Sequence, residues 1–197
     1  MLKRCFLCLM LLLSLGLPVH AMSVTALGNH IYLGHNDETA TSGDVKFVII
    51  NHVLHLMSKD GTKDFLSFIN TDGIVGSGVD YDVRDVYTSN PTMHLWEITA
   101  SSGAHGKNCG YWLVGPRPDG SYLSYVSIGN FAMLGYTKDQ WHRLSSELSN
   151  GLLVITSSHG YLPPGAQYGY ETKYANDFQV QIFWDDRVNW FGLRRIY

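Results

Sequence analysis

Short apolar runs separated by turn residues recur along most of this chain, and this pattern constrains its fold more than any other feature. Runs such as 45–50, 65–69 and 122–128 are rich in β-branched and aromatic residues, and glycine, proline, asparagine or aspartate stands between them. Turn signals at a spacing of roughly 8–12 residues favour an all-β sandwich or barrel. We therefore expect a mainly β fold, an antiparallel meander, sandwich or barrel-like sheet of about nine or ten short strands.

Three parts of the chain predict hairpins. Asp60-Gly61 lies between the runs 53–57 and 65–69, and the turn sequence 115–120 lies between 111–114 and 122–128. Near the end of the chain, apolar and more polar residues alternate over 178–184 before Asp185-Asp186 turns the chain. Such alternation indicates a strand with one buried and one more polar face.

One segment, residues 137–149, departs from the strand pattern and predicts an amphipathic helix. Thr137 and Gln140 have the spacing of a capping box, and Asn150-Gly151 is typical of a helix C-terminus. Apolar residues follow at i, i+3 and i+7, namely Trp141, Leu144 and Leu148. With this helix included, the fold is α+β.

The first 21 residues have the composition of a secretory signal. Lys3 and Arg4 precede an apolar run over 6–17, and Val19-His20-Ala21 ends it with a small residue at the expected cleavage position. The run is shorter than the ~20 residues that a membrane-spanning helix needs. We expect cleavage after Ala21, a single secreted or periplasmic domain over 22–197, and no transmembrane span in the mature chain.

Charge argues against nucleic acid as a partner. Loss of Lys3 and Arg4 lowers the basic residues from 14 to 12 against 17 acidic residues, a net charge of −5 with neutral histidines. No basic run suited to phosphate backbones remains.

Cysteine usage leaves three interpretations open. Removal of Cys5 and Cys8 with the signal leaves Cys109, so the mature chain cannot form an internal disulfide. A single thiol is a small buried hydrophobe, a partner in a disulfide with a second chain, or a nucleophile. The third interpretation predicts a cell-envelope cysteine hydrolase or transferase in which His105 or His159 is the base for Cys109.

Histidines are numerous, but their spacing does not predict a metal site. His52 and His55 are three residues apart, so on a strand their side chains point to opposite faces. Residues 22–197 contain no His-Glu-x-x-His or Cys-x-x-Cys motif. We expect neither a metal nor a cofactor.

The segment 161–174 combines tyrosines, prolines and glycines and predicts a loop with large amphipathic side chains. Tyrosine can stack on an apolar ligand face while its hydroxyl forms hydrogen bonds. The candidate ligand-binding residues are Tyr161, Tyr168, Tyr170 and Tyr174, together with Trp184 and Trp190. The preferred function is a non-catalytic module that binds an envelope protein, a glycan or a small ligand. Sheet edges and aromatic surface also leave self-association open.

Overall fold

The computed structural model describes residues 22–69, 78–102, 107–136, 143–165 and 173–197. These residues form thirteen strands and one short helix, arranged as three antiparallel sheets that do not close into a barrel. The mainly β class predicted from the sequence is therefore confirmed.

The central sheet has five strands in the order β1-β6-β7-β8-β9. Their bounds are β1 Val24–Leu33, β6 Val79–Thr88, β7 Leu95–Ser102, β8 Lys107–Pro116 and β9 Tyr122–Ser127. A short helix, α2 (Ile128–Ala132), follows β9 and buries Phe131.

Two four-stranded sheets follow the chain order. The first consists of β2 (Thr39–Ser42), β3 (Val45–Ile50), β4 (Val53–Ser58) and β5 (Asp64–Phe68). The second consists of β10 (Arg143–Ser149), β11 (Leu152–Tyr161), β12 (Lys173–Asp185) and β13 (Trp190–Arg195).

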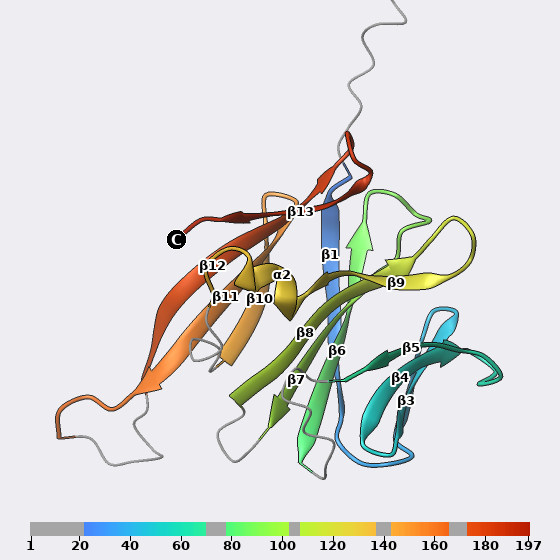
Figure 1. Cartoon of the computed structure of the whole chain (residues 1–197), viewed down its shortest axis with the longest axis horizontal. Coiled ribbons are helices and arrows are strands. Elements are labelled where there is room, and N and C mark those ends of the chain that lie inside the picture. The colour runs from blue at the N-terminus through green and yellow to red at the C-terminus, as the bar shows by residue number, and fades with distance from the viewer. Residues whose placement is uncertain (1–21, 70–77, 103–106, 137–142, 166–172) are drawn as a thin grey trace, which may run out of the picture.

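The central sheet lies between the other two and carries apolar side chains on both of its faces (Figure 1). Toward β2–β5 point Val83, Ile98 and Cys109. Toward β10–β13 point Val86, Leu95 and Leu113. Two hydrophobic cores result, one on each side of the central sheet. Burial on both faces is clearest in β7 and β8, where consecutive residues from Leu95 to Ile98 and from Asn108 to Tyr111 are buried. A strand that is covered on both faces has no solvent face.

The structure confirms the three predicted hairpins, β4–β5, β8–β9 and β12–β13. The alternation over 178–184 also has the predicted effect, since Phe178, Val180 and Ile182 are buried while the glutamines between them are not. Three strands, β1, β2 and β10, were not predicted, and they account for the excess over nine or ten.

The predicted helix over 137–149 is wrong for the part that the structure describes, because Arg143–Ser149 is strand β10. Trp141 lies outside the described residues. Asn150 and Gly151 both have positive φ, 51° and 75°, which is the geometry of a two-residue hairpin turn joining β10 to β11. The Asn-Gly pair thus ends a strand, and pairing with β11 outweighs a helical spacing built on only a few apolar residues.

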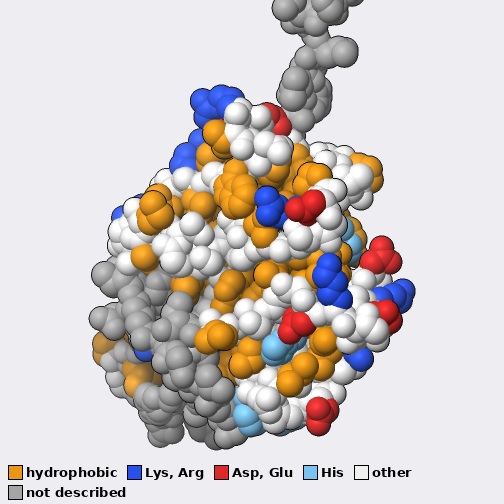
Figure 2. All heavy atoms as spheres, turned by 45° about the vertical axis from the view of Figure 1, so that its right-hand side comes forward, with side chains coloured by type: hydrophobic (Ala, Val, Ile, Leu, Met, Phe, Trp, Pro, Cys, Tyr) orange, Lys and Arg blue, Asp and Glu red, His pale blue; other side chains and the backbone are white. Residues whose placement is uncertain are grey.

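Surface features agree with a mixed-charge protein. On the face in Figure 2, acidic and basic side chains are interspersed among hydrophobic ones. No helix among the described residues is long and apolar enough to span a membrane.

Candidate functional site

A cavity of about 420 Å³ lies between the central sheet and the sheet β10–β13. Its floor comes from β1, β6, β7 and β8, and its wall from β10, β11 and β12. The lining residues are His30, Asp82, Arg84, Glu97, Thr99, Tyr111, Arg143, Leu144, Ser145, Ser146, Ile155, Ser158 and Tyr174.

Strand register brings the polar floor residues together. His30 pairs with Arg84, and Arg84 pairs with Glu97, across β1, β6 and β7. Asp82 and Tyr111 both pair with Thr99, which places them in the neighbouring row. Residues directly opposite one another in antiparallel strands share a face. The two rows therefore present their side chains to the same cavity.

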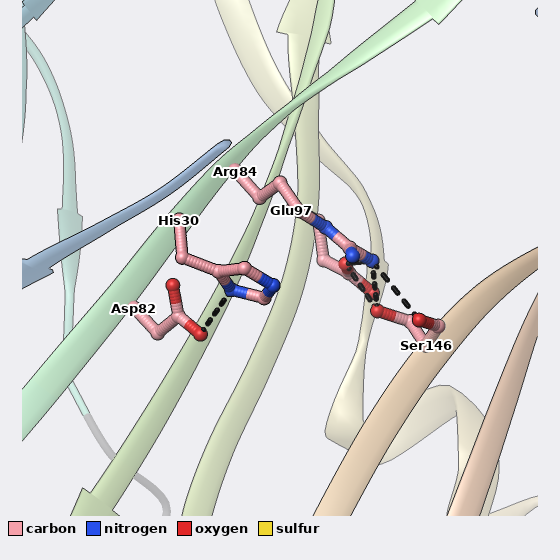
Figure 3. Close-up of polar contacts among 5 residues, drawn as sticks. All are labelled: His30, Asp82, Arg84, Glu97 and Ser146. Carbon is pink, nitrogen blue, oxygen red and sulfur yellow. Dashed lines mark hydrogen bonds and ion pairs between the residues drawn. The ribbon is translucent and has the colours of Figure 1, made fainter. Parts of the chain in front are cut away.

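A buried ion pair forms the centre of the floor. Arg84 Nη2 lies 2.8 Å from Glu97 Oε2, and the two side chains are only 10% and 4% exposed. The same nitrogen also donates to the Ser146 hydroxyl, which in turn donates to Glu97 Oε2 at 2.6 Å. Figure 3 shows this network joining the central sheet to β10. It links the two layers at the cavity.

A second ionisable pair lies beside the first. His30 Nδ1 is 2.7 Å from Asp82 Oδ2 (Figure 3). Tyr32, two residues along β1, stacks on the His30 ring with centroids 5.9 Å apart and is itself largely exposed. The Asp82 carboxylate fixes the orientation of the imidazole, since it occupies one ring nitrogen.

The cavity wall carries a cation and an aromatic ring. The Arg143 guanidinium lies 4.7 Å from the centroid of the Tyr174 ring, a cation–π distance. Within the described part of the chain, no carboxylate forms an ion pair with Arg143. Ser158 pairs with Arg143 across β10 and β11 and adds a hydroxyl to the wall.

Four buried polar atoms of the floor residues form no hydrogen bond with the described residues. They are Asp82 Oδ1, Arg84 Nε, Glu97 Oε1 and Tyr111 Oη. Each buried polar group without a partner costs about 1–3 kcal/mol, so four around one cavity are unusual. Neighbouring atoms cover all four, and a ligand reaches them only when a floor side chain moves.

Tyr111 is a neutral hydroxyl in this setting. Burial raises its pKa well above the ordinary value for tyrosine, and the Glu97 carboxylate raises the pKa further. The hydroxyl faces that carboxylate without meeting the geometry of a hydrogen bond. It therefore keeps its proton and can donate to another group.

The structure separates the predicted aromatic residues. Tyr174 is at the cavity and is 49% exposed, and Tyr161 is exposed at the end of β11. Trp184 is ten residues from Tyr174 on the same strand, a distance of roughly 30 Å at ~3.3 Å per residue. Trp184 and Trp190 instead pack around Tyr125. Tyr168 and Tyr170 lie outside the described residues.

The two described members of the cysteine alternative are not brought together. Cys109 is 3% exposed in the core between the central sheet and β2–β5. A bulge in β8, where Cys109 has no register partner, turns its side chain to that core, whereas Tyr111 faces the opposite one. His159 belongs to β11, on the other side of the central sheet. Its Nδ1 lies 2.6 Å from Asp177 Oδ1. His105 lies outside the described residues.

Metal-binding side chains do not gather in the described ranges, where no group of three or more histidine, cysteine, aspartate or glutamate residues is placed to hold an ion. The arrangement at the cavity is one of paired charges and hydroxyls. Such groups can form hydrogen bonds with a polar molecule.

Sequence reasoning missed most of the floor. Neither Asp82 nor His30 is among the candidate site residues that the sequence predicted. A usable signal was nevertheless present, because Glu97 interrupts the apolar stretch 95–98, and Arg84 and Asp85 stand between Val83 and Val86. Charged residues inside strands covered on both faces must be paired when buried.

Comparisons of the chain with protein-family models, with curated proteins and with solved structures found no match.

Proposed function

We propose that this protein is a non-catalytic binding module that holds a small polar ligand in the cavity between the central sheet and β10–β12. The observation that carries the proposal is the set of four buried, unpartnered polar atoms beneath one cavity floor. Proteins seldom leave such groups unsatisfied, and a polar ligand offers them partners.

The size of the cavity suits this role. A volume of about 420 Å³ lies within the range of ~300–1,000 Å³ that is usual for small-molecule sites. The lining combines a few polar groups with apolar surface from Leu144 and Ile155, which is also usual for such sites. Tyr174 connects the cavity with the tyrosine-rich segment predicted to contact the ligand.

Binding accounts for the geometry better than catalysis does. The Ser146 hydroxyl donates to Glu97 and accepts from Arg84, so it bridges an ion pair, and the carboxylate that it faces is already neutralised by the Arg84 guanidinium. Among the residues described, no hydroxyl or thiol hydrogen-bonds the second ring nitrogen of His30. These contacts support a site that orients a ligand.

We place the module outside the cytoplasm because residues 1–21 have the pattern of a cleaved signal. N-terminal sequencing of protein recovered from the envelope and the medium tests this. A mature chain that begins at Met22 is the expected result, and an intact Met1 in the cytoplasm would contradict it.

The binding proposal is tested by ligand-observed NMR with a library of small polar metabolites. Tyr111→Phe removes only the hydroxyl and keeps the ring that packs against Phe131, so the variant should fold. Ser158→Phe should fill the cavity. Tyr125→Phe is the matched control because its hydroxyl donates to Pro116 O and does not line the cavity.

The expected result is a ligand that binds the parent and Tyr125→Phe but binds Ser158→Phe poorly and Tyr111→Phe more weakly. No binding by any library member, or binding that Ser158→Phe leaves unchanged in a folded protein, would refute the proposal.

A further inference from the structure

The charges of the cavity are balanced, and this limits the class of ligand. Two carboxylates, Asp82 and Glu97, and two guanidiniums, Arg84 and Arg143, line the same space. Three of these four groups already have a partner in the protein: Arg84 and Glu97 form an ion pair, and Asp82 hydrogen-bonds the His30 ring. A strongly anionic ligand would meet the carboxylates and a strongly cationic one the guanidiniums, so neither is favoured.

A ligand that pairs with all four unpartnered atoms must carry both hydrogen-bond donors and hydrogen-bond acceptors. Asp82 Oδ1 and Glu97 Oε1 can only accept, Arg84 Nε can only donate, and the Tyr111 hydroxyl can do either. A ligand hydroxyl also does both. A molecule with several adjacent hydroxyls therefore meets the whole set without carrying charge.

The apolar part of the cavity lining also favours a ligand with several hydroxyls. Leu144, Ile155 and the Tyr174 ring share the cavity with these polar groups. A sugar ring has hydroxyls around its edge and C–H groups on its faces, and aromatic rings pack well on such faces while keeping a polar tip.

A zwitterion such as an amino acid is the strongest competing ligand, because it too is neutral overall. Its ammonium and carboxylate groups would each lose their hydration on entering the cavity. Glu97 is already paired with Arg84, and Asp82 already hydrogen-bonds His30, so of the four charged groups only Arg143 is left to offset that loss. Hydroxyl groups lose less on desolvation and make the same hydrogen bonds.

We infer that the cavity binds a neutral, polyhydroxylated ligand, a sugar unit, with Asp82, Arg84, Glu97 and Tyr111 contacting its hydroxyls. The inference rests on the proposed function and narrows its ligand class. Because the floor atoms are covered, binding moves floor side chains.

The test is a titration of the purified protein followed by protein-observed NMR. The probes are glucose, galactose, mannose, N-acetylglucosamine and xylose as neutral sugars, alanine and glutamine as zwitterions, succinate and inorganic phosphate as anions, and choline as a cation. Each is taken to roughly 10 mM, tenfold above a Kd of about 1 mM. Titrations are repeated at about 0.5 M NaCl, where screening weakens charged contacts.

Variants separate cavity binding from binding elsewhere. Loss of one ligand hydrogen bond should weaken affinity about twofold to tenfold, and we expect this for Tyr111→Phe. Asp82→Asn replaces an acceptor by a group of the same shape and should weaken binding similarly. Tyr125→Phe should bind like the parent.

Saturable binding of at least one sugar, insensitive to salt and weakened by Tyr111→Phe and Asp82→Asn, is the expected result. Binding of a zwitterion, an anion or choline in place of the sugars overturns this inference and leaves the proposed function standing. Sugar binding that neither variant changes also overturns it. If no probe binds and the metabolite library gives nothing either, both the inference and the proposed function fail.

Discussion

Removing one partner of the Arg84–Glu97 pair should be among the most damaging single changes in this protein. Arg84→Met leaves the Glu97 carboxylate 4% exposed, without the guanidinium 2.8 Å away and without the hydrogen bonds that tie Arg84 to Ser146. An uncompensated buried charge costs about 3–5 kcal/mol. Since folded domains have about 5–15 kcal/mol of stability, a large share should be lost.

Urea denaturation followed by circular dichroism measures this cost as a fall in the midpoint at an unchanged slope. The double variant Arg84→Met with Glu97→Leu should recover most of the loss, because an apolar pair of similar volume replaces a buried ion pair without leaving a charge. Arg187→Met is the matched control. Arg187 also pairs with an aspartate, Asp185 at 2.6 Å, but is 88% exposed, so its removal should change the midpoint little.

A cost below about 1 kcal/mol for Arg84→Met would refute the reasoning, since it would mean that Glu97 is solvated as well as a surface carboxylate. A double variant no more stable than the single one would refute it in another way. The loss would then come from packing around Arg84 and not from the stranded charge.

Three further predictions concern other parts of the molecule. Gly115→Ala should destabilise the protein by about 1–3 kcal/mol in urea, because the added methyl group would collide with the buried Leu95 side chain, and an unchanged midpoint would contradict this contact. Cys109 should react with iodoacetamide slowly in the native protein and quickly in urea, as followed by mass spectrometry, and equal rates would show that it is not in the core. Hydrogen bonds from Arg187 lower the pKa of Asp185 from 3.8 to about 2, so its contribution to stability is complete above the unfolded pKa and is lost as the pH falls through the folded one. The stability difference between the parent and Asp185→Asn should thus shrink between about pH 4 and about pH 2, and a difference that stays constant there would argue against the shift.

Local sequence patterns predicted the elements that are stabilised by interactions between residues close together in the chain. Asp60-Gly61 and the turn 115–120 identified hairpins because a tight turn and its flanking strands lie within about twelve residues of one another. The Asn150-Gly151 pair shows the limit of such signals. Asparagine and glycine both tolerate positive φ, so the pair suits either a helix C-terminus or a hairpin. Only the pairing of Arg143–Ser149 with β11 decides between them.

The candidate site depended on contacts that no local pattern records. His30 meets Asp82 across β1 and β6, which are separated by more than forty residues of chain. Glu97 meets Ser146 across two sheets. A charged residue inside an apolar strand indicates that a partner must exist, but not which residue supplies it.

By itself, then, the sequence determined the mainly β class, the hairpins and the alternation of buried and exposed positions, because turn chemistry and side-chain period act over a few residues. Tertiary structure alone decided that three sheets stack in layers, that Cys109 and His159 lie on opposite sides of the central sheet, and that paired charges gather beneath one cavity. Those outcomes depend on strand order and register between distant segments, where burial of both faces of the central sheet outweighs any local preference.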